Sequence, residues 1–417
     1  MLAVASGCST SEDERRQRPE PLSPLSAEGL TEDLRALARI AEAGGGDRAT
    51  GTPGYAASVK YVADELRAAG WRVRLQRVPL EVPSESAPPQ LTARRLGDLE
   101  PLRDFRTLSY SGAGQVSGRV RRAGEGCAPW EFATVLPGDV ALVGPDDCFN
   151  AHKAFYAKRS GARALIVAAD ANRRGVPSTT LSRPAGLPVI ALRRELADRL
   201  RSGNVVALRV SASVARGSTT NVIAEQGRGR RVAMAGAHLD SAPSAPGIND
   251  NGSGVATLLA VARAYGERAP GRMRLAFWGA EELGLYGSSR YLDRLSGGQR
   301  RRIAGYLNLD MVGSPNAVAS VYPIDDRGLT PLLRAAHPGS EEGLSAGGRS
   351  DHASFAEAGI PIGGLYTGST ERGPGGRSRD PCYHLPCDTL DNVDRRVLER
   401  MARATARALG RLARQAK

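Results

Sequence analysis

The chain has 417 residues, enough for about two or three domains, and its 41% hydrophobic and 24% charged residues are typical of a globular protein. No run reaches the ~18 consecutive apolar residues of a membrane-spanning helix. The net charge of +13 comes almost entirely from arginine, which is scattered with no basic block beside aromatic residues. We therefore expect no nucleic-acid partner.

Residues 1–26 are predicted to be the remnant of a signal peptide followed by a lipoprotein linker. The small residues that lead into Cys8 resemble a bacterial lipobox, and a polar stretch follows as a tether would. Ala5 stands where leucine is usual and no basic region precedes it, which fits a start inside a longer signal peptide. The alternative is a short apolar start with an incidental cysteine. A lipidated Cys8 would tether the protein to the membrane.

Residues 27–104 show the pattern of the first part of an α/β domain. Leucine or isoleucine recurs every three or four positions from 30 to 40, and apolar residues recur again from 61 to 69. This spacing predicts two amphipathic helices. Gly70 can end the second helix, and residues 71–75 alternate as a strand does.

Residues 105–213 are predicted to form a small inserted domain that is rich in β-structure. Strand-like runs at 139–143 and 164–167 are separated by glycine and proline turns, with a helix around 153–160 between them. This segment holds no cluster of catalytic His, Asp and Glu. The pair Cys127 and Cys148 would close it.

Residues 214–417 return to the α/β pattern and are predicted to complete the first domain. Apolar strands are expected at 231–237, 273–278, 303–309 and 360–366, and helices at 252–264 and 395–413. Short strands that alternate with helices predict a mixed, mostly parallel sheet with helices on both faces.

The five cysteines indicate an oxidising compartment. Besides Cys127 and Cys148, a second local pair, Cys382 and Cys387, encloses residues 383–386, and Cys8 stands alone. Two local pairs and one odd cysteine suit two disulfides. The alternative is buried free thiols. No CxxC spacing exists, so we do not expect a zinc ribbon.

The residues that carry chemistry lie mostly just past the ends of predicted strands, where open α/β sheets bind their ligands. They are, in chain order, His238, Asp250, Glu281, Glu282, Asp310 and His384. Imidazole and carboxylate are the usual zinc ligands besides thiolate. The set therefore predicts a site for a pair of metal ions, with one glutamate left over for proton transfer.

Each residue type suits a particular role. Asp250 lies between glycines that permit a tight backbone path, and it suits a carboxylate that bridges two ions ~3.5–4 Å apart. Asp240 lies two residues after His238, where its carboxylate can accept the imidazole N–H and fix the tautomer. In the pair Glu281 and Glu282, one carboxylate can bind metal while the other moves protons. Taken alone, such a pair would fit the solvated start of a helix equally well.

With these motifs together, the chain resembles the secreted two-zinc aminopeptidases of clan MH, the Streptomyces aminopeptidase type. The matching segments are GTPGY at 51–55, HLDS at 238–241, GINDNGSG at 247–254, FWGAEELG at 277–284, NLDMVGSP at 308–315, RSDH at 349–352 and CYHLPCD at 382–388. The resemblance runs from about residue 27 to the end, and the segment 105–213 resembles a protease-associated domain.

The resemblance implies the zinc exopeptidase fold, two zinc ions as cofactors and a role for each residue. It implies one zinc on His238 and Asp310, the other on Glu282 and His384, and Asp250 as the bridge. Glu281 would be the general base, and Tyr383 would donate a hydrogen bond to the oxyanion of the intermediate. The alternative for Tyr383 is a packed surface aromatic. A Cys382–Cys387 bridge would hold the Tyr383 turn rigid.

His352 is harder to assign. A His-Asp pair next to a serine can belong to a catalytic triad, but no Gly-x-Ser-x-Gly elbow occurs. We expect His352 in the wall of the pocket, with Arg349 and Asp351 near the substrate. His152 and His337 are expected on the surface.

The leading hypothesis is an aminopeptidase that acts on peptides as a monomer, secreted or extracellular, or lipid-anchored at the cell surface. A carboxypeptidase or dipeptidase on the same scaffold is an alternative, as is a glutaminyl cyclotransferase, a single-zinc relative. The complete ligand set and Tyr383 favour hydrolysis over cyclisation. A non-catalytic peptide-binding protein is the alternative from another class, and Glu281 argues against it because binding needs no base.

Overall fold

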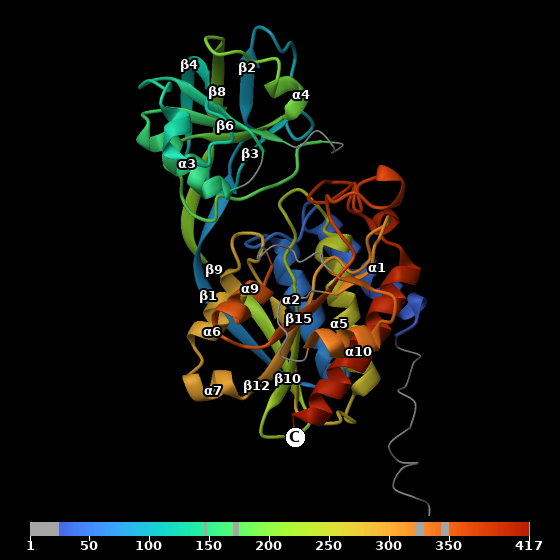
Figure 1. Cartoon of the computed structure of the whole chain (residues 1–417). Coiled ribbons are helices and arrows are strands. Elements are labelled where there is room, and N and C mark those ends of the chain that lie inside the picture. The colour runs from blue at the N-terminus through green and yellow to red at the C-terminus, as the bar shows by residue number, and fades with distance from the viewer. Residues whose placement is uncertain (1–24, 146–147, 170–174, 322–328, 343–349, 417) are drawn as a thin grey trace, which may run out of the picture.

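The chain folds around two β-sheets, one in the lower and one in the upper part of Figure 1. The computed structural model describes residues 25–145, 148–169, 175–321, 329–342 and 350–416. The smaller sheet is built from the single stretch 90–210, and the larger sheet takes its strands from the chain before and after that stretch. We call residues 90–210 the inserted domain.

The larger sheet is mixed, with a parallel centre. In spatial order its strands are β1 (Arg72–Glu85), β9 (Ala212–Gln226), β11 (Met273–Trp278), β10 (Val232–His238), β12 (Ile303–Leu309), β15 (Ile362–Tyr366), β13 (Ser320–Val321) and β14 (Glu341–Glu342). Strands β11, β10, β12 and β15 run parallel, and β9 and β13 flank them in the antiparallel sense. This confirms the predicted, mostly parallel sheet.

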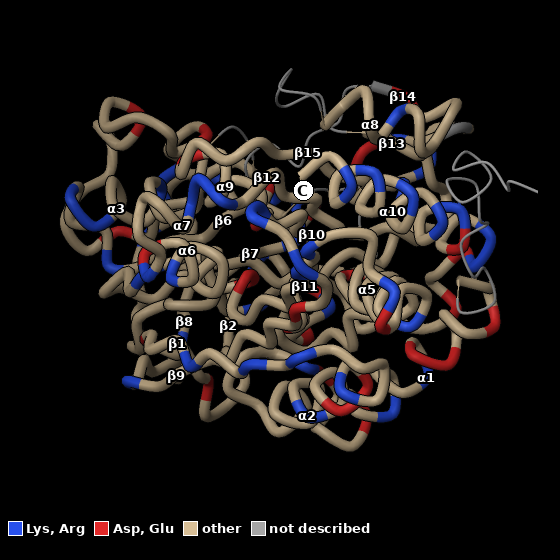
Figure 2. The backbone as a smooth tube through the Cα atoms, turned by 90° about the horizontal axis from the view of Figure 1, so that it is seen from below, with Lys and Arg blue, Asp and Glu red and all other residues tan. Residues whose placement is uncertain are grey.

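Helices cover both faces of the larger sheet, as predicted (Figure 2). One face carries α1 (Ala27–Ala43), α2 (Pro53–Ala68), α5 (Ser253–Tyr265), α8 (Leu329–Ala336) and α10 (Arg395–Gln415), and the other carries α6 (Tyr286–Asp293), α7 (Gly297–Arg301) and α9 (His352–Glu357). Helices α1, α2 and α10 begin where the side chains of Ser26, Thr52 and Asp394 accept N–H groups of the first turn. These caps explain why the helices start at these positions.

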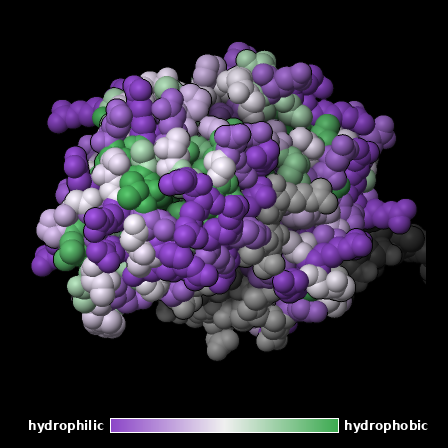
Figure 3. All heavy atoms as spheres, turned by 90° about the horizontal axis from the view of Figure 1, so that it is seen from above, coloured by the Kyte–Doolittle hydropathy of each residue, from purple (hydrophilic) through white to green (hydrophobic). Residues whose placement is uncertain are grey.

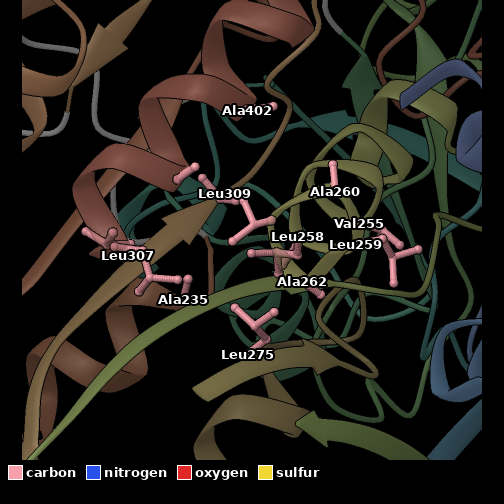
Figure 4. Packing of buried hydrophobic residues seen from close by; sticks show 14 of the residues in the cluster. Ala235, Val255, Leu258, Leu259, Ala260, Ala262, Leu275, Leu307, Leu309 and Ala402 are labelled. Carbon is pink, nitrogen blue, oxygen red and sulfur yellow. The ribbon is translucent and has the colours of Figure 1, made fainter. Parts of the chain in front are cut away.

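The central strands are buried on both faces. Along β10, Ala233 and Ala235 pack on the side of α5, while Met234 packs on the opposite side. Figure 4 shows Leu258 of α5 between Leu275 of β11 and Leu309 of β12. Burying one leucine in this way contributes about 1.5–3 kcal/mol. The packing holds the strand ends, and whatever side chains they carry, in fixed positions.

A two-stranded ribbon joins the two sheets. Strands β1 and β9 pair antiparallel over their whole length, from Arg72 opposite Glu225 to Glu85 opposite Ala212. Figure 1 shows the ribbon rising from the lower body into the upper one. The chain therefore enters and leaves the inserted domain at adjacent points.

The inserted domain is built on the smaller sheet. Its strands are, in spatial order, β2 (Gln90–Ala93), β8 (Val205–Val210), β4 (Gly114–Arg122), β5 (Val140–Val143), β6 (Ala164–Ala169), β7 (Val189–Arg193) and β3 (Phe105–Thr107). Helices α3 (Asn150–Arg159) and α4 (Arg194–Ala197) lie on opposite faces. The sheet begins at Gln90, ahead of the expected boundary at residue 105, because the short strand β2 pairs with β8 at the far end of the domain.

Short helical turns complete the described elements: η3 (Pro129–Phe132), η4 (Ile248–Gly252), η5 (Pro374–Gly376) and η6 (Leu390–Asn392). Both expected disulfides, Cys127–Cys148 and Cys382–Cys387, are present. Cys8 lies outside the described residues. Of the helices that the structure describes, none has the length and apolar character needed to cross a bilayer.

The outer surface of the inserted domain is mixed in character. Figure 3 looks down on this domain and shows a mostly hydrophilic face that is broken by hydrophobic side chains. Trp130, Phe149 and Phe155 are among the large apolar side chains exposed in this domain. The insertion thus presents aromatic groups to solvent while its two cores stay buried.

Candidate metal centre

Four of the predicted side chains follow adjacent parallel strands of the larger sheet. His238 is the last residue of β10, Asp310 directly follows β12, and Glu281 and Glu282 lie in the turn after β11. Because these strands are parallel neighbours, their carboxyl ends meet at one edge of the sheet. The sheet thus places the four side chains side by side.

Asp250 and His384 come from loops. Asp250 lies in η4 just before α5, and Gly247 ahead of it adopts a φ of 66°, in the left-handed region that favours glycine. The Asp388 carboxylate accepts the N–H of Asp250 at 3.0 Å. His384 lies in the loop 382–387, which a disulfide closes. Both loop residues are therefore held by the fold.

Five of the six side chains form two clusters that share Asp250, and Glu281 forms a further group with His238 and Glu282. Nε2 of His238 lies 3.2 Å from Oδ1 of Asp250 and 3.3 Å from Oδ1 of Asp310. Nε2 of His384 lies 3.1 Å from Oδ2 of Asp250 and 3.1 Å from Oε2 of Glu282. Asp250 thus turns one carboxylate oxygen to each imidazole.

This donor set fits divalent metal ions. With metal–ligand bonds of about 2.0–2.2 Å in a tetrahedral site, neighbouring donor atoms lie about 3.3–3.6 Å apart. The separations within both clusters, 3.1 to 3.3 Å, are close to that edge. Oε1 of Glu282 is buried and has no hydrogen-bond partner among the described residues. Imidazole nitrogen and carboxylate oxygen together suit zinc.

Main-chain oxygens orient the two imidazoles. Nδ1 of His238 lies 3.0 Å from the main-chain oxygen of Asp240, whereas the nearest carboxylate oxygen of Asp240 is 3.9 Å away. This corrects the expected contact through the carboxylate, which instead accepts the N–H of Glu281 at 3.2 Å and the Thr50 hydroxyl at 3.3 Å. Nδ1 of His384 lies 2.7 Å from the main-chain oxygen of Ser178, in the inserted domain. In both residues Nε2 is left facing the carboxylates.

The site carries a surplus of buried negative charge. Burial raises the pKa of Asp240 to about 6 and raises the pKa of Glu281 well above its ordinary range. Burial alone would lower the pKa of His384, but the carboxylates of Glu282 and Asp250 outweigh it and raise that pKa to about 10. Such a cluster of buried carboxylates favours the binding of cations.

Arg48 is a supporting residue that the sequence analysis missed. Its buried side chain donates hydrogen bonds to the main-chain oxygens of Leu239, Pro246 and Gly247, in the loop between the first two candidate ligands. Its own N–H donates to the Ser241 hydroxyl at 2.9 Å. A single arginine in an arginine-rich chain carries no signal beyond its place just ahead of GTPGY at 51–55.

Tyr383 and Asp351, two further predicted site residues, lie near this centre. The Tyr383 ring stacks on the His384 ring with 3.8 Å between centroids. Asp351 is buried, its pKa is raised to about 7 by burial, and its charge adds to the raised pKa of Glu281. Arg349 lies outside the described residues.

The remaining histidines stand apart from the two clusters. His352 is buried at the start of α9, and burial lowers its pKa to about 4. His152 is exposed and His337 is half-buried. None of the three belongs to the metal-binding groups found among the described residues.

Known proteins resemble this chain over most of its length. A family model described as peptidase family M28 matches residues 221–409. An aminopeptidase of Pseudomonas aeruginosa is 35% identical over 426 aligned residues, which cover 90% of this chain and 78% of that protein. A Mycobacterium tuberculosis protein named "Probable lipoprotein aminopeptidase LpqL" is 34% identical, with 93% of this chain and 85% of that protein covered.

Solved structures show the same likeness. The aminopeptidase from Aneurinibacillus sp. strain AM-1 has a TM-score of 0.76 and 27% identity, covering 95% of this chain and 96% of its own. A zinc aminopeptidase from Bacillus subtilis has a TM-score of 0.75 and 26% identity, covering 94% and 95%. These matches take in both sheets.

Proposed function

This chain belongs to peptidase family M28, and on that premise we propose that it removes amino-terminal residues from peptides with two zinc ions bound at the edge of the larger sheet. Its relatives make it a zinc-dependent aminopeptidase. The observation that carries the count of two is the position of Asp250, which turns one carboxylate oxygen to each imidazole. A carboxylate in this position would hold both ions of a two-metal hydrolase.

We assign the five metal ligands to two groups that meet at Asp250. His238 and Asp310 belong to one zinc ion, and Glu282 and His384 belong to the other. Bound zinc would lower the pKa of a water molecule towards ~7 and polarise the scissile carbonyl. Side chains of this protein are proposed to transfer the proton and to contact the substrate.

Glu281 is proposed to move the proton. It lies beside the ligands but is assigned to neither zinc, and its N–H is fixed by the Asp240 carboxylate. Burial raises its pKa, and as a carboxylate it would accept a proton from the attacking water. It then gives that proton to the nitrogen of the leaving amine as the C–N bond breaks.

Three further residues are proposed to contact the substrate. Tyr383, held by its stacking on His384, would donate a hydrogen bond to the carbonyl oxygen as negative charge develops there. Asp351, buried close to Glu281, would attract the free amino group of the peptide. Arg349 is proposed from the sequence as a further substrate contact. Together these contacts would select peptides with an unblocked amino end.

We propose that the enzyme works outside the cell, as a monomer. Both disulfides suit an oxidising compartment. One relative carries the name of a lipoprotein aminopeptidase, which agrees with a lipid anchor at Cys8.

The test is hydrolysis of leucine p-nitroanilide beside its N-acetylated form, with and without a chelator. We expect cleavage of the free-amine substrate alone, loss of cleavage after chelation and recovery when zinc is returned. Cleavage of neither substrate by protein that binds two zinc ions would contradict the aminopeptidase assignment and favour a carboxypeptidase or dipeptidase. Measured zinc per chain, by atomic emission, tests the count of two.

A further inference from the structure

The inserted domain contacts the second metal cluster directly. Residues 175–182, which we call the arm, pass close to the disulfide-closed loop 382–387 (Figure 1). Ser178 and His384 exchange two hydrogen bonds: Nδ1 of His384 lies 2.7 Å from the main-chain oxygen of Ser178, and the N–H of Ser178 donates to the main-chain oxygen of His384 at 3.1 Å. The arm therefore holds both the ring and the backbone of a metal ligand.

The arm also borders the turn that carries Glu281 and Glu282. Ala280 and Leu283, on either side of this pair, are buried in the same hydrophobic cluster as Leu181 of the arm. The main-chain oxygen of Ser182 accepts a hydrogen bond from the Tyr286 hydroxyl at 2.9 Å. The core of the inserted domain thus continues into the turn that holds the glutamate pair.

A third contact reaches the loop that precedes Asp250. Arg106 of β3 is buried, and it donates to the main-chain oxygen of Pro243 at 3.0 Å and to that of Val176 in the arm at 3.4 Å. One guanidinium therefore links the arm to the loop between His238 and Asp250. A planar group with several donors suits such a bridge between two segments.

The arm is fixed to its own domain by hydrogen bonds that follow Ser178 in the chain. The main-chain oxygen of Thr179 accepts the N–H of Ser109, and the N–H of Leu181 donates to the main-chain oxygen of Ser109, each at 3.0 Å. The side-chain amide of Asn150 donates to the Thr179 hydroxyl at 2.9 Å. The arm is therefore bonded to its own domain on one side and to His384 on the other.

We propose that the inserted domain is a positioning element of the metal centre, acting through the Ser178 carbonyl on His384. An imidazole whose Nδ1–H donates to a carbonyl keeps Nε2 unprotonated and aimed at the metal, and loss of such a partner costs about 10–100-fold in metal affinity. This inference rests on the proposed function for the identity of the metal. The inserted domain would thus take part in zinc binding although it lies far from His384 in the sequence.

The first test compares zinc retention in full-length variants. Arg106→Met removes the bridge between the arm and the loop at Pro243, and Thr179→Val removes the hydroxyl that Asn150 holds, with little change of shape. Thr92→Val makes the same chemical change on an exposed position of β2, and is the matched control. Zinc per chain is measured after equilibration against a graded series of chelator concentrations.

We expect Arg106→Met and Thr179→Val to lose one zinc ion at a chelator concentration that is at least about 10-fold lower than for the wild type. Thr92→Val should retain zinc as the wild type does. Equal retention by all four proteins would overturn the proposal. The readout is metal content, so zinc-binding protein without aminopeptidase activity would contradict the proposed function and leave this inference standing.

A second measurement needs no variant and decides the matter if a variant fails to fold. Hydrogen exchange of the wild type is followed with zinc bound and after chelation. We expect chelation to accelerate exchange of the Ser178 amide, which donates to His384, while amides of β8 at the far side of the inserted domain keep their rates. Unchanged exchange at Ser178 would overturn the proposal.

Discussion

The two halves of the candidate metal centre are supported in different ways. His238 and Asp310 follow the parallel neighbours β10 and β12, which are buried on both faces, so the sheet itself holds them. Glu282 lies in the turn after β11, and this turn packs against the inserted domain. His384 lies in a loop that a disulfide and the inserted domain hold. The first half is thus fixed by the strands that carry it, while the second also depends on chain that is distant in sequence.

Asp250 is the residue whose loss would damage both halves equally. Because it faces both imidazoles, Asp250→Ala should release both zinc ions and abolish turnover. Metal content by atomic emission checks this result, with Asp64→Ala, an exposed carboxylate of α2, as the control that keeps metal. Two ions still bound in Asp250→Ala would show that the halves do not share this carboxylate.

Glu281 lies between the halves, and its removal should not change the zinc content of either half. Glu281→Ala is expected to keep its zinc and lose turnover by about 10²–10⁴-fold, because proton transfer is removed while the ligands stay. The comparison is made by steady-state kinetics on protein of measured zinc content. Near-normal turnover would refute the role of Glu281 as base.

The disulfide of the loop 382–387 should matter for the second half alone. Replacing Cys382 and Cys387 together by serine is expected to lower the free energy of unfolding by about 2 kcal/mol, since a short covalent loop is opened. His384 would lose part of its support, so one zinc ion should leave at lower chelator concentration. If both ions stay bound as in the wild type, the arm alone is enough to hold His384.

The smallest expected effect concerns His352, which is buried at the start of α9. Burial lowers its pKa from 6.5 to about 4, so the folded protein prefers the neutral ring. As the pH falls from 6.5 to 4, the unfolded chain takes up a proton that the folded chain refuses. Stability is therefore lost over this range, by at most about 1.4 kcal/mol for each pH unit. His352→Gln should flatten this loss of stability.

Denaturant unfolding at pH 7 and at pH 4.5 gives the measurement for His352. The difference in unfolding free energy between the two pH values should be smaller in His352→Gln than in the wild type. An identical difference would mean that other groups set the acid sensitivity.

The first half of the site could be predicted from the sequence because its signal is local. Each apolar run that ends at His238 or Asp310 is a strand that stops at that residue or one residue before it. Residues that follow the carboxyl ends of parallel strands meet at one edge of the sheet, so their place in the sequence predicts their place in the site. The glycines around Asp250 likewise indicate the turn that presents it.

The supports of the second half could not be predicted in the same way. The acceptor for His384 is a main-chain oxygen, which every residue has, so nothing in the side chain of Ser178 marks it. For Asp240 the sequence placed the right residue beside His238 but the wrong atom, because backbone direction decides whether carbonyl or carboxylate faces the ring. Strand β2 joins the smaller sheet ahead of the expected boundary at residue 105, and a four-residue edge strand has little sequence pattern that could reveal this.

The ribbon of β1 and β9 bears on how the inserted domain could be gained or lost in evolution. Glu85 and Ala212 are paired across the ribbon, so a tight turn between them would close the larger sheet without the inserted domain. The junction is thus a natural point at which a lineage could gain or shed the whole domain in one event. A descendant that shed it would also shed the Ser178 carbonyl, and selection would first have to supply another acceptor for His384.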